Sequence, residues 1–316
     1  MGPEIAIALL SFAGGIVATL VGFVGKYIFD YKIAKRQFEL EKKVTERRLE
    51  LEERTSVSTV LGSSQANFAR ATGDLYARLS NFFEAPDKTR NWLEPADTPA
   101  EDEYYLREFC RRLFYFITWG RVTQDAINSL PIGVVEERPD LQRTYVFVNL
   151  ANSLLTYTWL FRGLENYRDE DESFHLFTGT LERIAELGVR LWKEGEQSIP
   201  LNSFDRHYDE EATMVVLRDL LAQVSEKSSD ESPNAPGIIV ARLATLFAVL
   251  AGFLAGNYSW VIDVPEEEEI VEHYKKNLQY AASITERDLP FPELVPQALA
   301  ELMDRYQSKP LSLKLS

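Results

Sequence analysis

Residues 5–24 (IAIALLSFAGGIVATLVGFV) constrain this chain more than any other feature, because twenty consecutive residues carry no charged side chain. A helix of that length spans about 30 Å, the hydrocarbon thickness of a bilayer. A cleaved signal peptide would need a basic start and a shorter apolar stretch, whereas the one charge ahead of this segment is Glu4. We therefore predict a transmembrane anchor over residues 1–25, in which residues 5–24 contact the lipid bilayer.

The charges that follow the anchor predict its orientation. Lys26, Lys32, Lys35 and Arg36 come directly after the apolar segment. Positive residues accumulate on the cytoplasmic side of membrane helices. We expect a single-pass protein of the cell (inner) membrane, with the N-terminus outside and the C-terminal domain in the cytoplasm.

Small residues recur along the predicted anchor. Gly14, Ala18 and Gly22 are spaced by four residues, so they share one face of a helix. Such a row lets a second membrane helix approach closely and predicts self-association. The alternative is that glycine is simply frequent in membrane helices.

Residues 26–55 predict a helical juxtamembrane stalk, because residues 26–54 contain no proline or glycine and are rich in Glu, Lys and Arg. Gln37 and Arg47 interrupt an incomplete heptad, whose apolar positions are Ile33, Leu40, Val44 and Leu51. We favour a short parallel coiled coil, which would add to self-association through the anchor. A solvated single helix is the alternative.

Residues 56–316 predict a cytoplasmic all-α domain, a multi-helix bundle, because apolar residues recur at three- and four-residue steps and no long stretch alternates with period two. Proline, glycine and capping residues divide this domain. The expected helices are 56–85, 99–130, 139–167, 172–195, 208–227, 237–260, 265–287 and 292–307.

Residues 237–262 leave two interpretations open. Arg242 is the only charge before Asp263, and Ala244, Ala248, Gly252 and Gly256 are spaced by four. The segment is therefore either the central core helix of the bundle, which we favour, or a second membrane span. A second span would leave the amphipathic helices beyond it with little core to pack on.

The charge balance excludes several classes of protein. The 316 residues carry 34 Lys and Arg against 49 Asp and Glu, and the part after Arg54 alone carries a net charge of −16. No nucleic-acid partner is expected, because binding phosphates requires a basic surface. An unknown protein partner should instead be basic or neutral. Cys110 is the only cysteine, so an intramolecular disulfide is excluded.

The sequence offers few candidates for chemistry. It contains no P-loop, and its three histidines do not fit an HExxH metal motif, so we expect no metal, no cofactor and no enzymatic activity. A polar stripe crosses the otherwise apolar residues 144–161. It is the best candidate for a small-molecule binding pocket and consists of Asn149, Asn152, Ser153 and Thr156. The alternative is that these side chains bond to neighbouring helices or face water.

Arg168 and His175 have the Arg-x6-His spacing of one known family. The pair resembles the motif of HEPN-class helical ribonucleases, and the resemblance covers eight residues. It implies a helical bundle that cleaves RNA at a dimer interface, with Arg168 and His175 as catalytic residues. The acidic residues 169–172 between them are a poor environment for a phosphate backbone.

Three functional hypotheses follow. The first is a membrane-anchored, non-enzymatic interaction or sensor module that tethers a protein partner or assembly at the membrane. The second is a membrane effector of the bacterial defence or stress type, which oligomerises through its membrane helix and perturbs the bilayer. The third is the HEPN-like ribonuclease.

Overall fold

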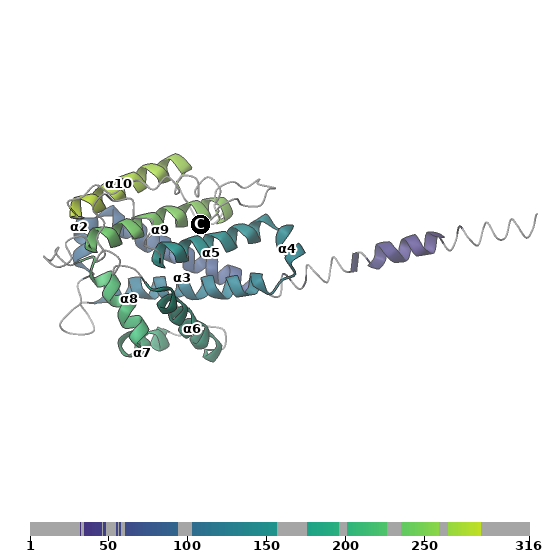
Figure 1. Ribbon diagram of the computed structural model, residues 1–316, viewed down its shortest axis with the longest axis horizontal. Coiled ribbons are helices and arrows are strands. Elements are labelled where there is room, and N and C mark those ends of the chain that lie inside the picture. The colour runs from purple at the N-terminus through teal and green to yellow at the C-terminus, as the bar shows by residue number, and fades with distance from the viewer. Residues whose placement is uncertain are drawn as a thin grey trace, which may run out of the picture. The chain divides into compact units, whose positions relative to one another are not determined.

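A computed structural model describes residues 32, 35–45, 47–48, 55, 57, 61–93, 103–156, 176–195, 201–225, 235–258 and 265–285 (Figure 1). The chain divides into two compact units, Met1–Thr59 and Val60–Ser316. Within the described ranges, every regular element is a helix and no strand occurs, which confirms the all-α prediction. The predicted anchor of residues 5–24, including Gly14, Ala18 and Gly22, lies outside the described residues.

The described part of the first unit is mainly the helical stretch of residues 35–45. Its apolar side chains are uncovered in the single chain: Phe38 is 68% exposed, Leu40 62% and Val44 65%. Leu40 and Val44 lie one helical turn apart and share a face, whereas Phe38 projects from a different side. This stretch is helical as expected, but the coiled coil stays a prediction.

The second unit is a helical bundle that begins with a long helix over residues 61–84. The labelled helices of Figure 1 follow it: α2 Pro86–Asn91, α3 Tyr104–Asn128, α4 Ile132–Glu136, α5 Pro139–Thr156, α6 Thr178–Glu194, α7 Leu201–Glu210, α8 Ala212–Ala222, α9 Ala235–Tyr258 and α10 Glu267–Thr285.

Aromatic side chains from four helices meet at the centre of the bundle. Phe68 of helix 61–84 packs against Phe116 of α3 and Phe147 of α5, with ring centroids 5.7 and 5.8 Å apart. Phe253 of α9 stacks on Phe147, with centroids 3.9 Å apart and planes 3° apart. All four rings are buried. Apolar residues distant in the sequence therefore form one continuous core.

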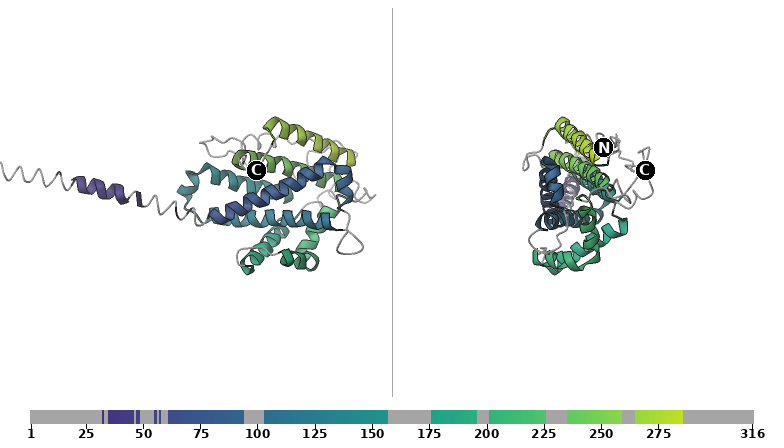
Figure 2. Two further views of the ribbon diagram at one scale, coloured as in Figure 1. Left: turned by 180° about the vertical axis from the view of Figure 1, so that it is seen from behind. Right: turned by 90° about the vertical axis from the view of Figure 1, so that its left-hand side faces the viewer.

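Helix α9 occupies the interior of this bundle and packs against α5 and α10, as both views show (Figures 1 and 2). Among the described residues, Pro236–Tyr258 is the one helix long and apolar enough to cross a membrane, and its most apolar stretch is entirely buried. Arg242 lies in the core as well, where its Nη1 donates to the Leu154 carbonyl at 2.8 Å. In the structure, residues 235–258 therefore form a buried core helix, the first of the two interpretations of this segment.

The α3–α6 contact depends on a glycine. Any Cβ at Gly188 of α6 would overlap the Thr118 side chain of α3, so only hydrogen fits there. Thr118 is itself buried and donates its hydroxyl to the Phe114 carbonyl at 2.8 Å. The close approach lets Trp119 and Trp192 pack edge to face, with centroids 5.4 Å apart.

The predicted helix 208–227 is wrong in its extent, because the structure has α7 and α8 on either side of Glu211. Glu211 has extended backbone angles, and its N–H bonds to the His207 carbonyl. Tyr208 and Met214 are both completely buried, yet in one straight helix they would point about 120° apart. The break turns both side chains into the core.

Other helix boundaries also differ from the predictions. The described part of α3 begins at Tyr104 rather than near Pro99, and the short helices α2 and α4 were not expected. Each of these two begins at a proline-containing turn. The expected helix 292–307 lies outside the described residues.

Candidate functional site

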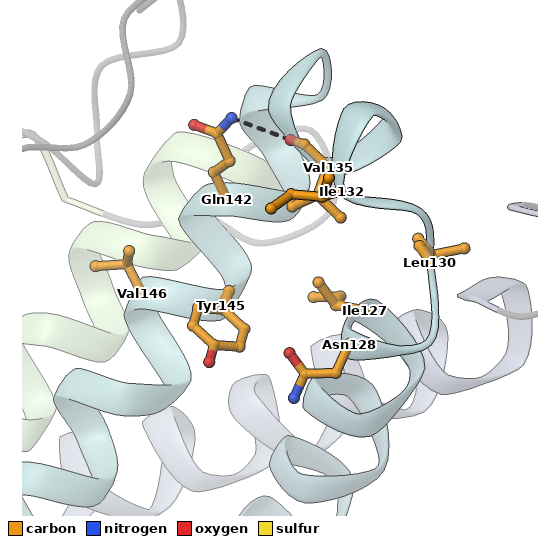
Figure 3. Close-up of a pocket in the computed structure, with 8 residues that line it drawn as sticks. All are labelled: Ile127, Asn128, Leu130, Ile132, Val135, Gln142, Tyr145 and Val146. Carbon is orange, nitrogen blue, oxygen red and sulfur yellow. Dashed lines mark hydrogen bonds between the residues drawn. The ribbon is translucent and has the colours of Figure 1, made fainter.

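An apolar groove lies at the junction of α3, α4 and α5 and has a volume of about 400 Å³. Figure 3 shows that its side chains come from the end of α3, the following turn, α4 and the first turns of α5. The lining consists of Ile127, Asn128, Leu130, Ile132, Val135, Gln142, Tyr145 and Val146. A mostly apolar hollow of this size with a few polar groups is typical of a binding site.

Local sequence explains the shape of the groove. Pro131 has no backbone N–H and precedes α4, so the chain turns sharply between α3 and α4. Gln142 then ties α5 to α4, because its Nε2 donates to the carbonyls of Val135 and Glu136, each at 3.0 Å. Ile132 is left 78% exposed at the rim.

The segment between α4 and α5, which connects the lining residues Val135 and Gln142, is acidic. Residues 136–140 contain Glu136, Glu137 and Asp140 against Arg138, a net charge of −2. Burial raises the pKa of Asp140, but the hydrogen bonds and charge of Arg138 outweigh it and hold that pKa below its usual value. Arg138 Nε and Nη2 donate to the two carboxylate oxygens at 3.0 and 2.8 Å. Glu136 and Glu137 are exposed.

The groove also has a defined place in the bundle. Thr123, one turn before Ile127 on α3, donates its hydroxyl to the Ser64 carbonyl at 3.2 Å. Ser64 lies near the start of helix 61–84. The groove is therefore at the end of the bundle where the chain enters it from the first unit.

The chemistry of this lining suits binding better than catalysis. None of the described residues that line the groove has a carboxylate, imidazole, amine or thiol side chain. Its polar groups are two amides and the Tyr145 hydroxyl, and both Gln142 bonds go to α4 carbonyls. Acid–base or nucleophilic catalysis needs groups of other kinds.

A second cleft, between α3 and α6, is charged. It has a volume of about 470 Å³ and is lined by Arg121, Asp125, Glu186, Val189, Arg190, Lys193 and Glu194. Arg121 Nε lies 3.0 Å from an Asp125 oxygen, and about half of each side chain is exposed. Three cations and three carboxylates balance, so this cleft selects neither an anion nor a cation.

The most developed polar cluster of the bundle surrounds Glu108 on α3. Arg111 binds its carboxylate with two hydrogen bonds of 2.8 and 2.7 Å, and Arg112 Nε adds a third at 2.8 Å. Arg78 of helix 61–84 approaches to 4.0 Å and lies over the Tyr105 ring. Arg112 also bonds to the Asp74 carbonyl at 2.7 Å. The cluster thereby joins α3 to helix 61–84.

The arginines decide the protonation of Glu108. Burial raises the pKa of Glu108, but hydrogen bonds from Arg111 and Arg112 and their charges outweigh it, and the pKa falls below its usual value. The carboxylate is 10% exposed and remains ionised at neutral pH. Because its hydrogen bonds join α3 to helix 61–84, we regard this cluster as structural.

Cys110 is a buried core thiol. It is 0% exposed, and burial raises its pKa far above the ordinary value. A thiol must ionise to react. Cys110 is therefore unsuited to nucleophilic or redox chemistry.

The structure gives the predicted polar stripe on α5 intramolecular partners. The hydroxyls of Ser153 and Thr156 donate to the carbonyls of Asn149 and Asn152, at 2.8 and 2.9 Å. The Asn149 side-chain oxygen accepts from Gln124 of α3 at 2.8 Å. None of the four residues lines the apolar groove. Their role in binding a ligand stays a prediction.

Other sequence candidates are placed only in part. Arg168 and His175 lie outside the described residues. His207 Nδ1 is 3.5 Å from Glu211, but across the described ranges no three His, Cys, Asp or Glu side chains form a group that would hold a metal ion.

The fold and this groove define an all-α bundle with an apolar surface site. No family model, no curated protein and no solved structure matches the chain. Its function therefore has to be argued from its own residues.

Sequence reasoning missed both the groove and the Glu108 cluster. The expected helix 99–130 ends just before Pro131, and the apolar residues Ile132 and Val135 beyond it belong to no expected helix. Glu108 stands three and four residues before Arg111 and Arg112, the spacing of helical ion pairs. This spacing indicates the contacts of Glu108 with Arg111 and Arg112. It does not indicate the contact with Arg78, because Arg78 comes from another helix.

Proposed function

We propose that this chain is a membrane-anchored interaction or sensor module without catalytic activity, which holds a protein partner or assembly at the cytoplasmic side of the membrane. In this proposal residues 5–24 supply the anchor and the bundle supplies the binding domain. The sequence has two long apolar segments, residues 5–24 and α9. Because α9 is buried in the bundle, residues 5–24 are the candidate for contact with lipid, which supports the proposal.

The observation that carries the proposal is the apolar groove beside α4. It lacks the side chains of a catalytic site, and Ile132 at its rim exposes 78% of its surface to water. Exposed apolar surface next to a concave site is typical of protein interaction sites.

A membrane experiment with the full chain tests this proposal. After alkaline washing of membranes, the chain should remain in the pellet, because an integral helix resists extraction. Capture of the detergent-solubilised full chain should recover a stoichiometric partner or an assembly. Ile132→Asp should abolish that recovery, whereas Val216→Asp, at a residue 44% exposed on α8, should not. Release by the wash, or equal recovery with both variants, would refute the proposal.

The membrane effector is a second candidate, favoured by the small residues Gly14, Ala18 and Gly22 in the apolar segment. Dye-loaded vesicles separate the two functions. Reconstituted full chain should leave such vesicles intact if it is an interaction module. Leakage that Gly14→Leu removes would favour the effector.

The third candidate is tested by Arg168→Ala and His175→Ala. If the intact chain cleaves RNA and both substitutions stop the cleavage, the HEPN-like ribonuclease replaces the module.

A further inference from the structure

We propose that the groove beside α4 binds the apolar face of residues 35–45 of a second copy of this chain, through Leu40 and Val44. This inference deepens the proposed function by naming the assembly and its contact. It rests on the proposed function only in taking the groove as a protein-binding surface.

The two surfaces are complementary in polarity. Leu40 and Val44 are 62% and 65% exposed and lie on one helical face. The groove offers an apolar hollow of about 400 Å³, which is enough for two aliphatic side chains. Self-association is already expected from the small residues of the anchor, so we assign the segment of a second copy as the occupant.

They are also complementary in charge. Residues 35–45 contain Lys35, Arg36, Lys42 and Lys43 against Glu39 and Glu41, a net charge of +2. Residues 136–140, which connect the lining residues Val135 and Gln142, carry −2. Electrostatic attraction of this kind fixes register and speeds association.

Pairing of two such segments with each other is less favourable. In the heptad that places Leu40 and Val44 at the seam, Gln37 and Arg47 occupy neighbouring seam positions. In a parallel pair Arg36 would face Glu41, but Lys43 would face Arg48, so one attraction is offset by one repulsion. The groove offers Leu40 and Val44 an apolar environment without these conflicts.

One segment and one groove in each copy are the elements that a closed assembly requires. Each copy carries one segment and one groove, and the groove lies at the bundle end where the chain enters from the first unit. Two copies can therefore exchange segments reciprocally, so that the same contact forms twice. Closed exchange of this kind gives a dimer instead of an open filament.

Cysteine crosslinking of the full chain in membranes tests the contact. One copy carries Leu40→Cys and one tag, and the other carries Ile132→Cys and a different tag. The native Cys110 is fully buried, and each single variant alone controls for it. We expect a crosslinked species of twice the chain mass that carries both tags.

Matched variants sharpen the result. Phe38→Cys, on the other side of the same segment, should crosslink to Ile132→Cys about tenfold less. Val146→Asp in the groove should reduce the Leu40 to Ile132 product about tenfold or more, because burying an aliphatic group typically accounts for that much affinity. Glu136→Lys with Glu137→Lys should reduce it severalfold, whereas Glu194→Lys on α6 should not.

Three outcomes would overturn the inference. They are crosslinking of Leu40→Cys only to itself, a product only within one chain carrying both cysteines, and equal crosslinking from Phe38→Cys. If any of these occurs while partner recovery still depends on Ile132, the inference fails and the proposed function stands. Loss of membrane association would instead refute the proposed function, whatever the crosslinks.

Discussion

Helix α9 and residues 35–45 are both helical, but the apolar side chains of α9 are buried and those of residues 35–45 are exposed. Nearly the whole of α9 is buried among other helices of its own chain, including the charged Arg242. Residues 35–45 are mostly polar, and their three large apolar side chains are all exposed. The more membrane-like of the two sequences is therefore the one that the chain itself covers.

The difference teaches that apolar content alone does not locate an interaction surface. In α9 the apolar residues encircle the helix, and neighbours from α5, α10 and helix 61–84 contact them. In residues 35–45 few apolar residues are present, and the described chain supplies no cover for them. Exposed apolar residues that share a helical face, such as Leu40 and Val44, are therefore better candidates for an interaction surface than the far more apolar α9.

The largest expected difference in stability is between two substitutions, one of a phenylalanine in α9 and one of a phenylalanine in residues 35–45. Phe253→Ala should lower the free energy of unfolding by about 3–5 kcal/mol, because it removes a ring stacked on Phe147 and leaves a cavity. Phe38→Ala should change it by less than about 0.5 kcal/mol, since that ring is 68% exposed. Denaturant unfolding of the full chain in detergent measures both. Similar losses in the two variants would break the comparison.

An intermediate effect is expected at Glu108. Glu108→Gln should destabilise the bundle by about 2–4 kcal/mol at neutral pH, because Arg78, Arg111 and Arg112 lose their common carboxylate. The control is Asp125→Asn, which breaks an exposed pair with Arg121 and should cost less than about 1 kcal/mol.

The Glu108 effect should depend on pH in a defined direction. Its pKa is lowered from 4.5 in the folded state, so the carboxylate stabilises the fold above that value. The contribution is lost as the pH falls through the folded-state pKa. Unfolding curves of the native chain and Glu108→Gln should therefore converge below pH 4.5. A gap that widens with acid would contradict the proposed role of the arginines.

The smallest expected effect concerns two glycines of α6. Gly188→Ala should destabilise the chain by about 1–3 kcal/mol, because the new methyl group overlaps Thr118. Gly179→Ala has open space and should be neutral or stabilise by up to about 1 kcal/mol. Thermal unfolding of the two variants distinguishes them. Equal behaviour would mean that α3 and α6 do not approach as closely as described.

Periodicity predicted the all-α class, the central position of α9 and most helices of the bundle, because burial of one helical face leaves a direct trace in the sequence. It failed at Glu211, where tertiary packing turns Tyr208 and Met214 inward and breaks one expected helix into two. It also missed the groove, which arises where Ile127, Ile132 and Val146 meet from three separate helices. Sequence spacing records neighbours within a helix, but a junction of helices depends on the packing of the whole bundle.

The most direct test of the central claim is a topology measurement on the full chain. A reporter that is active only outside the cytoplasm is fused after Ser316, and a cytoplasmic reporter is fused at the same position in a parallel strain. We predict a membrane-bound chain with only the cytoplasmic reporter active, because the proposal assigns residues 5–24 to the bilayer and α9 to the bundle. Activity of the external reporter, with the chain still in the membrane, would mean that α9 crosses the bilayer and would contradict the account.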